Sequence, residues 1–235
     1  MKAAILAGGA GTRLYPLTAY VPKTLIPIGS HYVIEYILDY LRRNGILEIV
    51  TLTTGNESEL LRNHLGDGKR FGVKIEYSIA ERIGTVGALE VAGSMLGTRF
   101  VVHYGDVLTD ADLDAMIQLH VSEKAICTIA MNTTVPMEYG VARVTEDGRV
   151  TYFEEKPVIK ESTVSMGIFI CEMEVLSYCK RNTDVSREVV PQVIRDGKPV
   201  YAYLTDKRHY DIGTFKNPED AREIVEHWRA PLQLG

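Results

Sequence analysis

The sequence has few of the residues that would place it in a specialised class of proteins. Its 235 residues include three cysteines, Cys127, Cys171 and Cys179, and no pair of them has the short spacing of a zinc site. An odd number of widely spaced thiols favours reduced cysteines in the cytoplasm over a disulfide framework. No run reaches the roughly 18 apolar residues of a membrane-spanning helix, and the apolar run near Met1 is too short for a signal peptide. We therefore expect a cytoplasmic protein without a membrane partner.

Positive charge is also not in excess. The chain has 26 Lys and Arg residues against 31 Asp and Glu residues, which gives a formal net charge of −5. Nucleic-acid binders usually carry a basic excess, so we expect no nucleic-acid partner. The negative charge does not argue against an enzyme that acts on nucleotides, because a nucleotide site needs only a few local cations and a metal. The hydrophobic share of 46% and the charged share of 24% are ordinary for a globular protein.

The first half of the chain predicts an alternation of strands and helices. Short apolar runs alternate with segments whose apolar residues recur at a helical period. Such an alternation is typical of a parallel sheet flanked by helices. We expect strands at 2–7, 49–54, 73–78 and 100–103, and helices at 33–43, 57–65, 88–96 and 110–121.

The second half changes character. Asp147-Gly148 between two strand-like runs predicts a hairpin. The sequence shows no repeat and no linker. We therefore expect one α/β domain over residues 1–228, with a small antiparallel insert, and a loose tail at 229–235. The strands are expected at 125–133, 141–145, 150–155, 163–171 and 200–204, and the helices at 173–180, 186–195 and 218–228.

A glycine-rich loop follows the first expected strand, with Gly8, Gly9 and Gly11 ahead of Arg13. Glycines let the backbone approach a ligand closely, and free amides in such a loop can hold phosphate oxygens. The glycines alone could simply end a strand, since their spacing is neither the GxGxxG of dinucleotide-binding folds nor that of a P-loop. Arg13 adds a planar fork for phosphate, and Lys23, in the segment PKTLIP, adds a point charge. The combination favours phosphate binding.

These two segments resemble the opening of the sugar-phosphate nucleotidyltransferases, a family that includes mannose-1-phosphate guanylyltransferases, glucose-1-phosphate thymidylyltransferases and related uridylyltransferases. Further segments resemble the family's motifs in the family's order, over nearly the whole chain. They are the nucleobase loop Gly84-Thr85-Val86-Gly87-Ala88, the metal turn Gly105-Asp106-Val107, the sugar segment Tyr139-Gly140-Val141-Ala142, Glu154-Glu155-Lys156-Pro157, Ser165-Met166-Gly167-Ile168-Phe169 and Asp211-Ile212-Gly213-Thr214. The resemblance implies a Rossmann-like fold with a mixed, mostly parallel sheet. The short remainder after Thr214 predicts no β-helix domain of the kind that several relatives carry.

The resemblance also implies a reaction. An oxygen of a sugar 1-phosphate attacks the α-phosphorus of a nucleoside triphosphate, and pyrophosphate leaves, so charge neutralisation and positioning should dominate catalysis. Arg13 would hold the β- and γ-phosphates, Lys23 the α-phosphate and Lys156 the sugar phosphate, while Asp106 and Asp211 would hold Mg²⁺. Gly140 and Glu155 would contact the sugar. The nucleotide would be bound by Leu6, Gly8, Gly9, Gly11, Thr12, Gly84, Gly87 and Ala88.

Each of these residues also has a purely structural explanation. Asp106 and Asp211 could cap or start turns, and Lys156 could be a surface lysine; the surrounding motifs favour function. His103 is the one histidine expected near the site, and a structural role is favoured for it. Tyr104 stands where the family commonly has asparagine. This departure affects the expected geometry of the metal turn and not the expected class of enzyme.

The base and the sugar are less constrained. Gly87 occupies the position where thymidylyltransferases usually carry glutamine, which leaves room for a purine, and the layout from Ser186 to Tyr201 is similar to the guanylyltransferase branch. We expect GTP and mannose 1-phosphate, with uridylyl or thymidylyl transfer to glucose 1-phosphate as the alternative. There are two further alternatives. One is a catalytically inactive paralogue that binds a nucleotide sugar, and the other is a nucleotidyltransferase with a phosphate acceptor other than a sugar phosphate. A dehydrogenase is disfavoured by the glycine spacing. The prevalence of twofold assemblies favours a homodimer.

Overall fold

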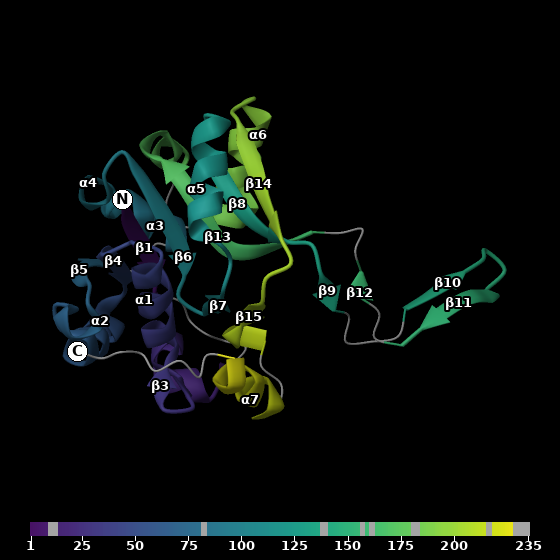
Figure 1. The fold of residues 1–235 in the computed structure, drawn as a ribbon, viewed down its shortest axis with the longest axis horizontal. Helices are drawn as coiled ribbons and strands as arrows, with labels where there is room; N and C mark the ends of the chain where they lie inside the picture. The colour runs from purple at the N-terminus through teal and green to yellow at the C-terminus, as the bar shows by residue number, and fades with distance from the viewer. Residues whose placement is uncertain are drawn as a thin grey trace.

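A mixed sheet forms the centre of the molecule (Figure 1). The computed structural model describes residues 1–8, 14–80, 84–136, 141–155, 158–159, 163–179, 184–214 and 218–227. Within these residues the strand order is β14-β8-β13-β6-β1-β4-β5. Strand β13 runs antiparallel to both neighbours, and the other pairs are parallel. The strands are β1 (Lys2–Leu6), β4 (Glu48–Thr53), β5 (Lys74–Ile79), β6 (Arg99–Tyr104), β8 (Cys127–Asn132), β13 (Val164–Glu172) and β14 (Val200–Thr205). The mixed, mostly parallel sheet is confirmed.

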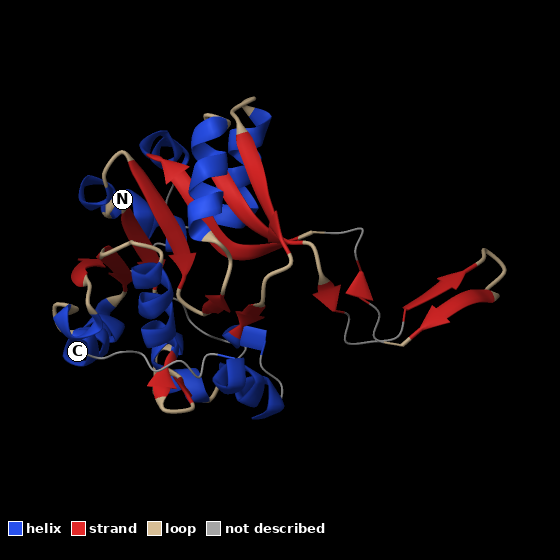
Figure 2. Cartoon of the chain, in the orientation of Figure 1, coloured by secondary structure: helices blue, strands red, loops and turns tan. Residues whose placement is uncertain are grey.

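Helices cover both faces of this sheet (Figure 2). Along β1, Ala3 and Ile5 belong to one hydrophobic cluster, and Ala4 and Leu6 to another. Successive strand residues point to opposite faces, so a strand covered on both sides is apolar without alternation. The first cluster includes residues of α1 (Val33–Arg43), α2 (Gly55–Leu65), α5 (Leu113–Ser122) and α7 (Pro218–His227), and the second includes residues of α3 (Gly84–Val91), α4 (Gly93–Leu96) and α6 (Val190–Arg195).

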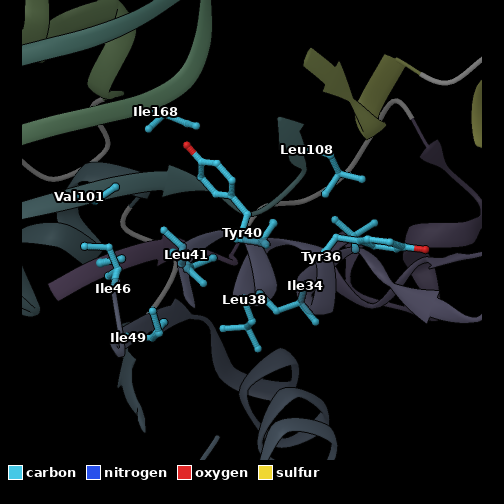
Figure 3. Packing of buried hydrophobic residues seen from close by; sticks show 14 of the residues in the cluster. Ile34, Tyr36, Leu38, Tyr40, Leu41, Ile46, Ile49, Val101, Leu108 and Ile168 are labelled. Carbon is cyan, nitrogen blue, oxygen red and sulfur yellow. The ribbon is translucent and has the colours of Figure 1, made fainter. Parts of the chain in front are cut away.

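Helix α1 forms the core of the first layer (Figure 3). Its residues Ile34, Leu38 and Leu41 are almost fully buried, and they recur at the helical spacing that predicts one apolar face. The Glu35 carboxylate accepts a hydrogen bond from the Tyr32 amide at 3.0 Å, which satisfies a donor that the first helical turn leaves unpaired. Gly45, with φ of 72°, follows the end of the helix. The predicted helix over 33–43 is confirmed.

Four expected helices differ in detail. The helix expected at 110–121 begins at Leu113, after a cap formed by Asp112. The helix expected at 88–96 is α3 and α4, separated at Ala92, and α3 begins earlier, at Gly84. The segment Met173–Tyr178 is a 3₁₀ helix. The helix expected at 186–195 begins as a π-helical turn, Val185–Val189, before α6. Pro191 accounts for the second start, because proline lacks an amide donor and fits the first turn of a helix.

Several short strand pairs were not expected from the sequence. Strands of two or three residues are too short to show a period, so no pattern marks them in advance. The pair β7–β15 is the most important for function, because it borders the candidate active site. The pairs are β7 (Val107–Thr109) with β15 (His209–Asp211), β2 (Pro27–Ile28) with β3 (His31–Tyr32), and β9 (Val135–Pro136) with β12 (Val158–Ile159).

The antiparallel insert forms a hairpin that projects from the body of the molecule (Figure 1). Strand β10 (Val141–Val144) pairs with β11 (Val150–Glu154), and the described side chains are exposed along nearly its whole length. Gly148 in the turn has φ of 86°, which suits glycine. The predicted hairpin is confirmed. The tail expected at 229–235 lies outside the described residues. Among the described helices, none has the length and apolar character needed to cross a membrane.

Candidate active site

A cavity of about 360 Å³ lies where β1 and β6 end. The chain leaves β1 towards β4 on one side, whereas β6 lies on the other side of β1. Such a switch point at the carboxyl ends of parallel strands is the usual ligand site of an open α/β sheet. Because β13 runs in the opposite direction, its amino end reaches the same edge. The cavity is lined by Leu6, Ala7, Gly8, Lys23, Thr24, Tyr104, Gly105, Asp106, Val107, Ser165, Gly167, Ser186, His209 and Asp211.

Gly105 allows the turn after β6 to lie directly against β1. Its amide donates to the Leu6 carbonyl at 3.1 Å. A Cβ on Gly105 would lie 2.7 Å from that carbonyl oxygen and 2.8 Å from Cγ2 of Thr24, so any side chain would push the turn away. This close approach places Asp106 beside the segment that carries Lys23.

Lys23 and Asp106 form an ion pair at the cavity. The Lys23 Nζ lies 2.7 Å from Oδ2 of Asp106, and the two side chains are only 18% and 19% exposed. Lys23 begins a short 3₁₀ helix, Lys23–Leu25, in which the Leu25 amide donates to the Pro22 carbonyl. A charge-assisted bond of this kind holds both groups in place.

The β7–β15 pair brings a second carboxylate to the same place. Asp211 stands opposite Val107 in the ladder, and the Ile212 amide donates to the Asp106 carbonyl at 2.8 Å. The Asp211 Oδ1 accepts from the Gly213 amide at 2.8 Å. Two carboxylates from distant parts of the chain thus line one cavity, and Mg²⁺ is often held by one or two carboxylates together with phosphate oxygens. Asp106 and Asp211 are the two carboxylates that line this cavity among the described residues.

The cavity is also lined by side chains that carry hydroxyl groups. The Tyr104 hydroxyl lies 3.1 Å from Oγ of Ser186, and Ser165 lines the cavity beside them. Burial raises the pKa of Tyr104 to about 12, so this hydroxyl keeps its proton at neutral pH.

Two histidines lie near the cavity in different ways. His103 is buried, does not line the cavity, and its Nδ1 donates to the Tyr104 carbonyl at 2.7 Å. Burial lowers the pKa of His103 to about 4, which agrees with the structural role expected for it. His209 does line the cavity, and burial lowers its pKa. Sequence reasoning missed His209, although a residue two positions before Asp211 on a strand points to the same face.

A sequence model described as "Nucleotidyl transferase" matches residues 2–227. The chain belongs to the nucleotidyl transferase family. It is 33% identical over 252 residues to a UTP–glucose-1-phosphate uridylyltransferase of Synechocystis sp., which covers 98% of this chain but 62% of the relative. It is 30% identical over 234 residues to the D-glycero-alpha-D-manno-heptose 1-phosphate guanylyltransferase of Aneurinibacillus thermoaerophilus, covering 97% of this chain and 100% of the relative.

The chain thus spans less than two thirds of the length of the Synechocystis relative. The crystal structure of HddC from Yersinia pseudotuberculosis shares the nucleotidyltransferase fold with a TM-score of 0.75 at 22% identity, covering 97% of this chain and 99% of that one.

The structure brings some of the predicted nucleotidyltransferase residues together and leaves others apart. Those that line the cavity are Leu6, Gly8, Lys23, Asp106 and Asp211. Gly84, Gly87 and Ala88 do not line it, and they form the first turns of α3 rather than a loop. Glu155 follows β11 on the projecting hairpin, is exposed and does not line the cavity. Gly9, Gly11, Thr12, Arg13, Gly140 and Lys156 lie outside the described residues.

Proposed function

We propose that this protein transfers a nucleoside monophosphate from a nucleoside triphosphate to a sugar 1-phosphate and releases pyrophosphate. The observation that carries the proposal is the meeting of Lys23, Asp106 and Asp211 at one cavity. These groups come from three distant segments and suit the binding of phosphates with a divalent cation. Both curated relatives described above are named as nucleotidyltransferases of sugar 1-phosphates, which supports the same reaction class here.

The chain's own residues have separate parts in this reaction. The sugar phosphate is already a nucleophile, so the protein has to align two anions and neutralise charge. Lys23 would exchange part of its contact with Asp106 for an oxygen of the α-phosphate as charge builds there. Asp106 and Asp211 would hold Mg²⁺, which when bound supplies positive charge to the triphosphate. Gly8 lines the cavity two residues after β1, and a Cβ there would lie 3.2 Å from Cγ2 of Thr54, so glycine lets the chain pass close to the end of β4.

The roles of several residues remain predictions from the family resemblance. Arg13 would hold the β- and γ-phosphates, and Lys156 the phosphate of the sugar. Gly140 and Glu155 would contact the sugar ring. Gly9, Gly11 and Thr12 would complete the phosphate loop, and Leu6, Gly84, Gly87 and Ala88 would border the base.

For the substrates we propose GTP and a manno-configured sugar 1-phosphate such as mannose 1-phosphate. The family resemblance implies that Gly87 would leave space for a purine, and the relative from Aneurinibacillus is named as a guanylyltransferase of a manno-heptose phosphate. UTP with glucose 1-phosphate is the second candidate, because the Synechocystis relative of similar identity is named for that pair. A silent binding protein is disfavoured, since Lys23, Asp106 and Asp211 are all in place. We further propose a cytoplasmic homodimer.

Pyrophosphate release tests the function directly. The protein is incubated with Mg²⁺, each of the four common nucleoside triphosphates, and a panel containing mannose, glucose and manno-heptose 1-phosphates. Release that requires both substrates supports the proposal, and the most active pair identifies base and sugar. No release with any pair, in a protein that binds nucleotide by calorimetry, would contradict transfer to a sugar phosphate. A second series with EDTA in place of Mg²⁺ tests the metal requirement.

A further inference from the structure

Two of the hydroxyl groups at the cavity, those of Tyr104 and Ser186, lie within hydrogen-bonding distance of each other. Tyr104 ends β6 directly before the Gly105-Asp106 turn, and its hydroxyl meets the Ser186 hydroxyl at 3.1 Å. Both residues line the same cavity as Asp106 and Asp211. The roles proposed for Lys23, Asp106 and Asp211 assign no part to this pair of uncharged groups.

The tyrosine ring is held by its neighbours. Gly167 on β13 has φ of +68°, and a Cβ there would lie 3.1 Å from Cγ of Tyr104. The Phe169 ring packs on the Tyr104 ring with a centroid distance of 5.8 Å. A ring fixed in this way presents its hydroxyl in one position, which favours selective recognition.

The serine is also held in place. Ser186 lies in the π-helical turn Val185–Val189, and its amide donates to Oδ1 of Asp184 at 2.9 Å. The same carboxylate oxygen accepts from the Arg187 amide at 3.0 Å. The backbone that carries the Ser186 hydroxyl is therefore tied down at the start of the turn.

The position of the pair within the sheet indicates what it faces. The candidate base-binding helix α3 follows β5, on the far side of β1 and β4 from β6. Tyr104, Ser165 and Gly167 lie on the other side, at β6 and β13. A sugar 1-phosphate whose phosphate lies next to the α-phosphate at Lys23, and whose ring extends towards β13, would meet the hydroxyls of Tyr104, Ser165 and Ser186. Neutral hydroxyls that can both donate and accept suit a sugar ring.

We propose that the hydroxyls of Tyr104 and Ser186 form a paired hydrogen-bonding group that contacts a hydroxyl of the sugar 1-phosphate and determines which sugar is accepted. This inference rests on the proposed function and names two specificity-determining residues within it.

The test uses Tyr104→Phe, which removes one oxygen and keeps the ring, and Ser186→Ala. For each variant, kcat and KM are measured for the nucleotide and for mannose and glucose 1-phosphates. We expect KM for the preferred sugar phosphate to rise about tenfold, as for one lost hydrogen bond to substrate, while kcat and the nucleotide KM stay within twofold. The preference between the two sugars should fall by a similar factor. The double variant should resemble the single variants, because either change breaks the pair.

Tyr36→Phe provides the matched control. The Tyr36 hydroxyl donates to the Ile28 carbonyl at 2.8 Å and does not line the cavity, so its loss should leave sugar preference unchanged. An unchanged sugar KM in both Tyr104→Phe and Ser186→Ala, or a rise confined to the nucleotide KM, would overturn the inference.

If the proposed function is wrong, the result will differ, because the wild-type protein itself will release no pyrophosphate. Calorimetric titration with the same two sugar phosphates, with nucleotide and Mg²⁺ present, then decides the inference. Weaker binding to Tyr104→Phe than to wild type supports it. Equal binding, or no binding to either protein, overturns it.

Discussion

Two sets of side chains line the cavity and are positioned in different ways. The charged set, Lys23, Asp106 and Asp211, is positioned by backbone contacts, such as the bond from the Ile212 amide to the Asp106 carbonyl. The uncharged set, Tyr104 and Ser186, is positioned by packing and by a helix cap.

Under the proposed function the two sets have separate tasks. The charged set would stabilise the charge that builds on the phosphates, which every substrate pair shares, so it should act on turnover. The uncharged set would contact the sugar in the ground state and the transition state alike, so it should act on KM and on sugar preference. Variants of the two sets should therefore give different kinetic patterns.

Removing the charge of Lys23 should have the largest effect. Lys23→Met keeps most of the aliphatic stem, and we expect kcat to fall about 10²–10³-fold, the usual loss when one group that stabilises transition-state charge is removed. The factor should be the same for every sugar phosphate, measured as steady-state pyrophosphate release. Lys74→Met is the control, because Lys74 is exposed and paired with Glu76 away from the cavity. Turnover near that of the wild type would remove Lys23 from the reaction.

Asp211→Asn should have the next largest effect. The amide keeps the size of the side chain and loses its charge, so we expect the Mg²⁺ concentration for half-maximal activity to rise by about tenfold or more. Asp67→Asn, a change at an exposed carboxylate paired with Lys69, should leave the Mg²⁺ titration unchanged. The same titration curve for wild type and Asp211→Asn would argue against Asp211 as a metal ligand.

Variants at two glycines test whether packing against β13 positions the Tyr104 ring of the uncharged set. Gly167 and Gly197 have nearly the same φ, +68° and +69°, but a Cβ on Gly197 would meet nothing within 4 Å. Gly197→Ala should lower the free energy of unfolding by about 1–2 kcal/mol, the cost of the left-handed backbone for an L-residue. Gly167→Ala should lower it further and raise the sugar KM, because the methyl group presses on the Tyr104 ring. Equal losses in urea unfolding would show that the ring is not held by this contact.

Much of the fold follows from local patterns in the sequence. The strands β1, β4, β5 and β6 and helix α1 coincide with the predicted segments within a residue or two, because their apolar residues recur at the period of each structure. The start of α3 was missed because Gly84 and Gly87 have low helix propensity, whereas the burial of Val86 and Leu89 favours the helix. Tertiary packing outweighs propensity in such cases.

The cavity was predictable only in part. The family resemblance named Lys23, Asp106 and Asp211, and these residues do meet. It could not indicate that Tyr104 contacts Ser186, which is 82 positions away, because such contacts follow from strand order rather than from local sequence. The pairing of β7 with β15 was missed for the same reason, and His209 was missed with it.

The smallest expected effect concerns His103, whose Nδ1 donates to the Tyr104 carbonyl directly before the Gly105-Asp106 turn. Its folded pKa is lowered to about 4 by burial, whereas an unfolded histidine titrates near 6.5. Between these values the unfolded chain binds a proton that the folded protein does not bind. His103 therefore costs no stability above pH 6.5, and the free energy of unfolding should decline below it, by at most about 1.4 kcal/mol per pH unit down to about pH 4.

His103→Asn provides the comparison, since an asparagine amide can donate in place of Nδ1 and has no titratable proton in this range. Urea unfolding at pH 7, 6 and 5 should give a shallower decline for the variant than for the wild type. The decline should not vanish, because burial lowers the pKa of His120 and His209 in the same direction. Identical declines would mean that His103 binds its proton equally well in the folded and unfolded states.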